Sequence, residues 1–249
     1  MIVSTDAVVL RTVNYSETSI IVTLFTKNSG KITLMAKGAR KPKSPFAAQL
    51  EPMNILNINY FHKDSRNIQL LKESTFIDNS MSIRETYESL NYGLSIVEIL
   101  DKLLQEYDVD PIIYRLCIKT LSAIKDSLAQ YDIIFSFFLL QLSIRLGFMP
   151  ELNRCCNCTQ PLETAKFDEH RGELMCENCV HGGEIKFSAG TIKLLQALIK
   201  THIDNLHELK YADQNLIEID SFLDYYSKFH LDGMTKVKSL KILRELVHG

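Results

Sequence analysis

The first 80 residues alternate between short apolar runs and turn-forming residues, in the manner of β-strands joined by tight turns. The runs are rich in β-branched residues, and asparagine, serine, glycine and proline interrupt them. Five short strands with short turns favour a small closed barrel of the OB type, with an SH3-like barrel or a small sandwich as the alternatives. The predicted strands cover residues 3–13, 19–26, 31–37, 54–61 and 67–74.

After residue 80 the apolar residues recur every three to four positions, which is the period of amphipathic helices. Asp110, Asp132 and Ser188 are predicted helix caps, and Pro111 occupies a favoured first position. The third helix is the most apolar, but its run of 16 residues contains an arginine and is shorter than the ~20 residues that span a bilayer. It is therefore predicted to be a buried core helix. The predicted helices cover residues 83–104, 111–128, 133–148, 191–201, 215–228 and 237–247.

The change of period predicts an α+β multidomain fold. A barrel at residues 1–80 precedes a helical domain at 81–249, and a cysteine-bearing insertion at 151–187 interrupts the helices. The composition, 46% hydrophobic and 23% charged, is typical of a globular protein and excludes disordered and disulfide-scaffold classes. The N-terminal residues lack the basic and apolar regions of a signal peptide, so we expect a cytoplasmic protein.

Charge is distributed unevenly along the chain. The first 80 residues carry ten lysines and arginines against six acidic residues, a net of +4, whereas the remainder carries 18 against 24, a net of −6. A basic front end on an acidic body indicates that a polyanion would bind at the predicted barrel.

The densest basic cluster follows the third predicted strand, where Lys37, Arg40, Lys41 and Lys43 fall within seven residues. On a small barrel such a loop would follow a phosphate backbone. A solvated turn is the opposing interpretation, and charge alone leaves both open. Arg11 on the first strand is a further DNA-binding candidate. Aromatic residues for base stacking are available, but the pattern does not select among Tyr15, Phe25, Phe46, Tyr60 and Phe61.

Five of the six cysteines lie between residues 155 and 179. Cys155-x-x-Cys158 and Cys176-x-x-Cys179 are separated by 17 residues, the spacing of a four-cysteine zinc site. Two such turns can direct four thiolates at one ion, so we expect one structural zinc per chain. Cys156 competes with Cys155 as the first ligand, although the spacing favours Cys155. A hairpin is predicted around Gly172.

Other uses of these cysteines fit less well. A redox C-x-x-C pair usually occurs once, in a thioredoxin-like setting. Zinc deaminases need an open coordination position and an H-x-E motif, which neither His170 nor His181 begins. Cys117 lies in an apolar helix and is predicted to be a core residue. The sequence has no P-loop, G-x-G-x-x-G after a strand, H-E-x-x-H or G-x-S-x-G, so a binding protein is expected and not an enzyme.

Several runs along the chain resemble the RecO family of bacterial recombination mediators. The most specific is AKGARKPKS at 36–44, which leads to Leu-Glu-Pro at 50–52. Two departures are Met53, where the family usually has an aromatic residue, and the doubled Cys155-Cys156. The other matching runs are residues 7–11, 15–18, 25–26, 30–31, 146–150 before the paired C-x-x-C motifs, 226, 229–231 and 238–240.

The resemblance implies a function that residue spacing does not supply. RecO-like proteins bind single- and double-stranded DNA and anneal complementary strands without ATP. They associate with RecR and with the acidic C-terminal tail of the single-stranded-DNA-binding protein, and they help to load RecA at gaps. This implies a cytoplasmic, nucleoid-associated bacterial protein. Some members lack the zinc cysteines, which implies that the metal serves stability. The alternative from another class is a zinc-ribbon RNA-binding or transcription-associated protein that uses the barrel for nucleic acid.

Overall fold

The computed structural model describes residues 1–46, 48–180, 185–240 and 242–243. The chain forms two compact units. The first comprises Met1–Leu121 together with the chain from Lys236 onward, and the second comprises Ser122–Thr235. Among the helices described, none is both long and apolar enough to cross a bilayer. The division into functional domains at residue 80 stays a prediction.

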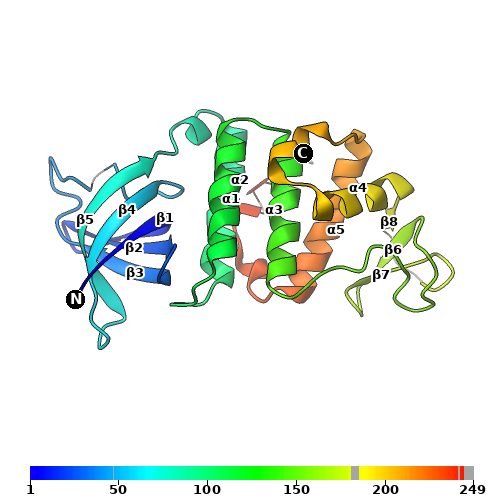
Figure 1. The fold of residues 1–249 in the computed structure, drawn as a ribbon, viewed down its shortest axis with the longest axis horizontal. Helices are drawn as coiled ribbons and strands as arrows, with labels where there is room; N and C mark the ends of the chain where they lie inside the picture. Colours follow the sequence, from blue (N-terminus) through cyan, green and yellow to red (C-terminus); the bar gives the residue numbers. More distant parts are fainter. Residues whose placement is uncertain (47, 181–184, 241, 244–249) are drawn as a thin grey trace. The chain divides into compact units, whose positions relative to one another are not determined.

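The first unit begins with a closed five-stranded barrel, drawn in blue to cyan in Figure 1. Around the barrel the strands follow the order β1-β2-β3-β5-β4, and β4 pairs with β1 to close it. Only the β3–β5 pairing is parallel. The expected OB-type barrel is therefore confirmed. The strands are β1 (Ile2–Tyr15), β2 (Ser19–Thr26), β3 (Gly30–Ala36), β4 (Ile55–Phe61) and β5 (Ile68–Asp78).

The strand ends differ from the prediction where pairing extends the strands. Residues 19–26 form a strand as predicted, whereas β5 continues to Asp78 because it pairs with β4 along its length. The 14-residue β1 has a bulge between Val9 and Arg11. Such a bulge bends a strand and turns its side chains. It lies where β1 leaves its pairing with β4, which ends at Val8, and continues along β2.

The barrel core follows from the two-residue period of its strands. In β3 and β4 buried side chains alternate with partly exposed ones, so that one apolar face fills the interior. Residues of the loop between β3 and β4 complete the packing at one end: Ala39 and Leu50 are buried, and Phe46 packs against them. The fully buried strand residues include Val22, Leu24, Ile32, Leu34, Leu56 and Ile58.

One buried amide fixes the end of that loop. The Asn54 side chain donates to the backbone carbonyls of Ala48 and Gln49, at 3.1 and 3.0 Å. Its Oδ1 accepts hydrogen bonds from the Ser80 backbone N–H at 3.0 Å and from the Ser80 hydroxyl at 2.8 Å. Because Asn54 is only 3% exposed, water cannot replace these partners. The amide thus joins the β3–β4 loop to the segment after β5.

Two helices follow the barrel after the short 3₁₀ helix Ser82–Arg84: α1 (Tyr87–Leu103), which belongs to the first unit, and α2 (Pro111–Lys125), whose residues from Ser122 onward are counted with the second. The predicted start of α1 at residue 83 is wrong. Thr86 is extended, and its hydroxyl accepts the Ser89 N–H at 3.1 Å, which begins the helix one residue later. Asp110 caps α2 as predicted, since its carboxylate accepts the N–H groups of Ile112 and Ile113.

Polar contacts attach the barrel to α1 and to the segment after it. Asp101 accepts a hydrogen bond from Arg11 Nε at 3.0 Å, and its backbone carbonyl accepts one from Lys31 Nζ at 2.7 Å. Burial lowers the pKa of Lys31, against the attraction of Asp101 and Glu106. Gly30 has φ +66°, and a Cβ there would overlap the backbone of Asp108. Only glycine therefore permits this close approach.

The second unit contains α3 (Tyr131–Arg145), α4 (Ala189–Lys200) and α5 (Asp213–His230), and the 3₁₀ helix Ile203–Glu208. The prediction that Asp132 caps the third helix is wrong: Gln130 is the N-cap, and Asp132 lies in the first turn. The helix ends at Arg145 because Gly147 adopts φ +95°. Ser188 caps α4 as predicted, and its hydroxyl accepts the Thr191 N–H at 3.3 Å.

A three-stranded sheet carries the cysteine-bearing segment, with strand order β7-β6-β8. The predicted hairpin around Gly172 is present as β6 (Ala165–Asp168) and β7 (Glu173–Met175), and Gly172 has φ +69°. The two-residue β8 (Lys186–Phe187) was not predicted, because it is too short to show a period. After the 3₁₀ helix Met234–Lys236, residues 239–240 and 242–243 of the last predicted helix are helical, and five of its eleven positions, 241 and 244–247, lie outside the described residues.

Replacing Asn54 with alanine should lower the free energy of unfolding by about 2–4 kcal/mol, because several buried partners lose their hydrogen bonds. Asn59→Ala is the matched control, since the exposed Asn59 amide makes one hydrogen bond, to Glu73 at 3.2 Å. That control should lose less than about 1 kcal/mol. Urea unfolding of both variants measures the difference, and equal losses would contradict the role given to Asn54.

Candidate metal centre and nucleic-acid interface

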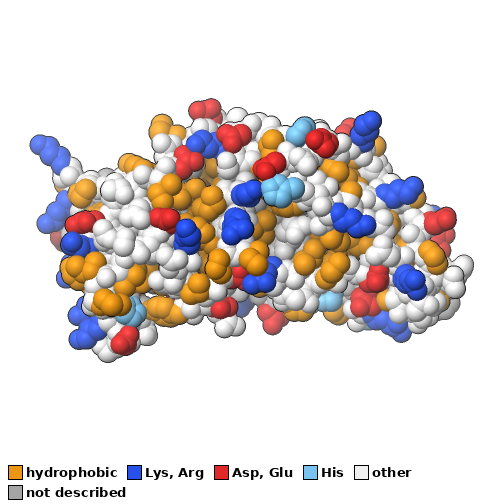
Figure 2. All heavy atoms as spheres, viewed as in Figure 1, with side chains coloured by type: hydrophobic (Ala, Val, Ile, Leu, Met, Phe, Trp, Pro, Cys, Tyr) orange, Lys and Arg blue, Asp and Glu red, His pale blue; other side chains and the backbone are white. Residues whose placement is uncertain are grey.

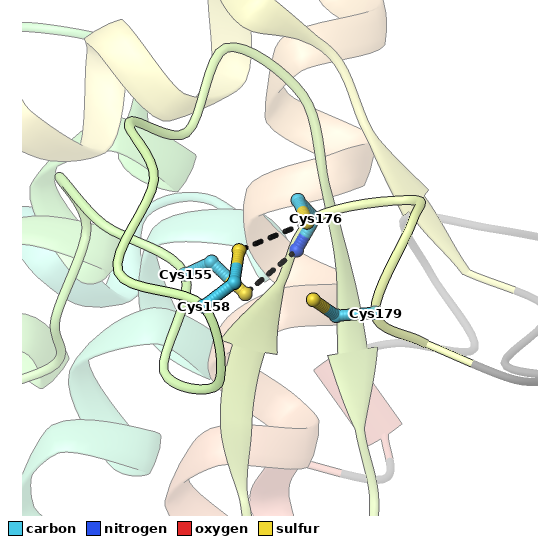
Figure 3. Close-up of side chains that lie close together, drawn as sticks. All are labelled: Cys155, Cys158, Cys176 and Cys179. Carbon is cyan, nitrogen blue, oxygen red and sulfur yellow. Dashed lines mark hydrogen bonds between the residues drawn. The ribbon is translucent and has the colours of Figure 1, made fainter.

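Four cysteine side chains of the second unit converge on one point. The sulfurs of Cys155, Cys158, Cys176 and Cys179 all lie within 4.8 Å of one another. Figure 3 shows the four side chains directed inward, with the sulfurs of Cys158 and Cys176 3.7 Å apart. Cys155 is buried and the other three are partly exposed. The structure thus brings together the residues predicted from the spacing, in an arrangement able to hold a metal ion.

Backbone turns place these sulfurs. In the first turn the Thr159 N–H donates to the Cys155 carbonyl at 2.9 Å, and Thr159 adopts a positive φ. The second turn follows β7 directly, and the Cys179 N–H donates to the Cys176 carbonyl at 3.0 Å. The two turns meet where the Cys176 N–H donates to the Cys155 sulfur at 3.4 Å, as Figure 3 shows. Each C-x-x-C motif is therefore held in a hydrogen-bonded turn.

Two adjacent cysteines have opposite protonation behaviour. Burial opposes ionisation of Cys155, but backbone N–H donors from Cys158, Cys176 and Asn157 outweigh it and lower the pKa of Cys155 to about 6. Burial, together with the neighbouring Glu173 carboxylate, raises the pKa of Cys156 to about 11. Cys156 is not one of the four converging residues. The structure therefore selects Cys155 as the first member of the cluster.

The remaining cysteine belongs to the core of the first unit. Cys117 is fully buried in α2, and burial raises the pKa of its thiol to about 12. A thiol in such surroundings stays protonated and unreactive.

The predicted basic loop lies at one end of the barrel. Lys37, Arg40, Lys41 and Lys43 are all exposed, whereas Ala39 between them is 1% exposed and packs into the barrel core. Because Ala39 points inward, its neighbours are held outward. In Figure 2, Lys and Arg side chains project at the left edge of the view, over the loop that follows β3.

Hydrogen bonds give the loop a defined turn. The Arg40 N–H donates to the Thr18 carbonyl at 2.9 Å, and its guanidinium donates to the Ser16 carbonyl at 3.2 Å. The Lys41 N–H donates to the Gly38 carbonyl at 3.0 Å, which closes a turn. The loop is therefore attached to the β1–β2 turn as well as to the core. Arg11 differs from the loop residues because it is engaged with Asp101 and, at 3.3 Å, with the Thr23 hydroxyl.

The five aromatic candidates divide by exposure. Phe25 and Tyr60 are buried, and Phe46 packs against the barrel core. Tyr15 and Phe61 are 49% and 39% exposed, so these two are available to a nucleic-acid base.

Sequence reasoning missed a second basic turn on the barrel. Lys63 and Arg66 are exposed between β4 and β5. The Gln69 side chain, 1% exposed, donates to both of their carbonyls and accepts the Lys63 N–H at 2.9 Å. Both residues contributed to the regional charge, but they lie some twenty positions from the main cluster in the sequence. Only the buried glutamine that organises the turn could have drawn attention to them.

Comparison with known proteins relates both parts of the chain to one family. The family description "Recombination protein O N terminal" matches residues 1–80, and "Recombination protein O C terminal" matches residues 84–241. A protein named DNA repair protein RecO from Chloroherpeton thalassium is 31% identical over 99% of this chain and 100% of its own length. Its counterpart from Oceanobacillus iheyensis is 28% identical over 99% of this chain and 94% of its own length.

A shorter but closer match comes from the DNA repair protein RecO of Salinibacter ruber, which is 42% identical over 153 residues. That match covers 61% of this chain and 59% of the Salinibacter protein. The two family descriptions together cover the barrel, the helices and the four converging cysteines of this chain. The chain belongs to the RecO family of DNA repair proteins.

Proposed function

We propose that this chain is a recombination mediator that binds single- and double-stranded DNA and anneals complementary strands without ATP. The observation that carries the proposal is the basic loop held outward from an OB-type barrel by the buried Ala39. Lysine and arginine neutralise phosphates irrespective of sequence, which suits a protein that must pair any two complementary strands. The proposed activity is binding and pairing, with no catalytic step.

The cationic side chains of the loop are placed to contact the phosphate backbone of DNA. Lys37, Arg40, Lys41 and Lys43 are exposed on one short, hydrogen-bonded segment, and the Lys63–Arg66 turn adds two further cations on the same barrel. Arg11, half-exposed and paired with Asp101, is proposed to contribute less. The exposed aromatic rings supply stacking surfaces that accept every base.

The proposed partners follow from family membership. We infer that the chain acts with RecR to help load RecA onto DNA coated by the single-stranded-DNA-binding protein, whose acidic tail it also binds. An acidic tail needs an apolar pocket beside a cation, for which Arg145 and Lys193 in the second unit are the candidates. These partners imply a cytoplasmic location at the nucleoid.

We propose zinc as the metal of the four-cysteine cluster, with a structural role. Four thiolates are the donor set of a closed, tetrahedral zinc site, which leaves no position for a substrate. Zinc–sulfur bonds of ~2.3 Å give a tetrahedron with an edge of about 3.8 Å, close to the separation of the Cys158 and Cys176 sulfurs. When bound, the ion would join the two turns and add its binding free energy to the folding of this segment.

Protein purified without added metal should contain about one equivalent of zinc per chain. Cys158→Ser should lose most of it, because one of four ligands is gone, and should lower the thermal stability of the protein. Mass spectrometry of metals together with thermal unfolding measures both effects.

Cys156→Ser is the matched control, because Cys156 is the adjacent cysteine that lies outside the cluster. It should retain a full equivalent of zinc. Less than about half an equivalent in the unaltered, reduced protein, or equal loss in both variants, would remove the assignment.

Replacing Lys37, Arg40, Lys41 and Lys43 together with glutamine should weaken single-stranded DNA binding by about tenfold or more at low salt. The slope of log affinity against log salt concentration should fall by about 2–3, because each phosphate contact on a single strand contributes about 0.7. Fluorescence anisotropy at several salt concentrations gives both values, and the rate of complementary-strand pairing without ATP should fall with them.

The control variant carries the same change of net charge in the second unit and just beyond it. Lys193, Lys200, Lys210 and Lys236 are exposed and distant in sequence from the barrel, and glutamine at all four should leave the salt slope unchanged. If the loop variant keeps its affinity and slope while folded, the loop is a solvated turn and the proposed interface is wrong.

A further inference from the structure

A pocket of the second unit has chemistry opposite to that of the basic loop. It has a volume of about 170 Å³ and lies where the end of α3, strand β7 and helix α5 meet. Its walls combine aromatic rings with two carboxylates, Glu151 and Glu173. Besides the two carboxylates, its lining includes Phe148, Met149, Phe222, Tyr226 and His230.

The aromatic wall is ordered by the period of α5. Phe222, Tyr226 and His230 are spaced by four residues, which places them along one helix face. The Tyr226 ring stacks on Phe222 with centroids 5.3 Å apart and lies 4.3 Å from the His230 ring. Phe148 completes the wall from the opposite segment, 5.6 Å from His230. The rings hold one another in place, and Phe148 is the most accessible of the wall's phenylalanine and tyrosine rings, 39% exposed against 0% for Phe222 and 3% for Tyr226.

A hydrogen bond to the backbone of the β6–β7 hairpin fixes the position of His230. His230 Nε2 donates to the Gly172 carbonyl at 2.8 Å. Gly172 permits the approach because a Cβ there would overlap the ring of Phe229. The hairpin between β6 and β7 is thereby locked against the end of α5, and Glu173 follows directly on the rim. The pocket is a built feature of the unit.

The charges at the rim are negative. Glu151 and Glu173 are both exposed, and the charge of Glu173 is close enough to Tyr226 to add to the burial that raises the pKa of this tyrosine to about 12. Among the described lining residues there is no lysine or arginine. Arg171 does not line the pocket, but it adjoins the Glu173 side of the rim: its guanidinium donates to Asn157 at 3.4 Å, and its side chain also contacts Cys156, which Glu173 contacts too. Phosphate groups would be repelled from such a rim.

These observations select one kind of occupant. The cavity is smaller than the roughly 300 Å³ at which cofactor and drug-sized sites begin, and it suits a single side chain. An apolar side chain would remove the two carboxylates from water without compensation. A cation would instead gain attraction from the carboxylates and from the exposed Phe148 ring.

We propose that the pocket bounded by Phe148, Tyr226 and His230 and rimmed by Glu151 and Glu173 receives a lysine or arginine side chain of a partner protein. This site is separate from the proposed DNA interface, and its failure would leave that interface untouched. A basic segment of a partner would place one cationic side chain in the aromatic wall, with its charge between the two carboxylates.

The test uses the full-length, zinc-loaded protein labelled with ¹³C at its methionine methyl groups. Met149 lines the pocket and is 63% exposed, and Met149→Leu identifies its signal. The probes are the N-acetyl amides of arginine, lysine, norleucine and glutamate, titrated at constant ionic strength. Arginine and lysine amides should shift the Met149 signal saturably, and the norleucine and glutamate amides should bind more weakly or not at all.

Variants that remove one negative charge distinguish binding in the pocket from nonspecific attraction of cations to the acidic surface. Glu151→Gln keeps an acceptor for the Asn153 N–H that Glu151 now caps at 2.7 Å, and Glu173→Gln keeps the shape of the rim. Each should weaken the arginine amide about two- to fivefold, the worth of an exposed ion pair. Glu163→Gln, an exposed glutamate of the same unit outside the pocket, should change nothing. Equal or tighter binding of norleucine or glutamate amide, or no saturable shift with either cation, would overturn the proposal.

Discussion

Closure of the barrel is the constraint on which the first unit depends. β3 pairs with β5 in parallel, and β4 lies between β5 and β1, so that β5 separates the consecutive strands β3 and β4. The chain must therefore cross one end of the barrel between β3 and β4. Crossing a barrel end brings apolar side chains over the core, and Ala39 and Leu50 are buried in that core. The polar residues between them are left in solvent, so one connection seals the core and displays the cations.

The second unit is organised by contacts that close short segments. Two C-x-x-C turns direct four sulfurs at one point, and the hairpin between them meets α5 at Gly172. Neither arrangement needs a large hydrophobic core of its own. The cysteine-bearing segment is held at one end by the four converging cysteines. At the other end it is held by the hydrogen bond between His230 and the Gly172 carbonyl. The same contact aligns the aromatic wall of α5 with the carboxylates of the rim.

Strong local patterns made most of the fold predictable. The two-residue period gave the barrel strands, the residues Asp110 and Ser188 marked true helix starts, and the cysteine spacing identified the residues that converge. The errors lie at helix starts, where local capping geometry and not the apolar period fixes the first residue. Thr86 begins α1 after the point where the apolar period starts, and Asp132 enters the first turn, where its charge favours the helix dipole. The exposure of Tyr15 and Phe61, and the pocket beside α5, depend on packing between distant segments and have no local pattern.

The inward position of Ala39 has a consequence for the entropy of binding. A flexible loop with four long cationic side chains would lose backbone freedom on meeting a polyanion, at about 1–2 kcal/mol for each residue fixed. Here Ala39 and the hydrogen bonds of Arg40 to the β1–β2 turn have already removed much of that freedom during folding. Only the side-chain ends remain to be ordered. The loop is a preorganised surface, and under the proposed function a DNA strand would leave it and return without the backbone folding anew each time.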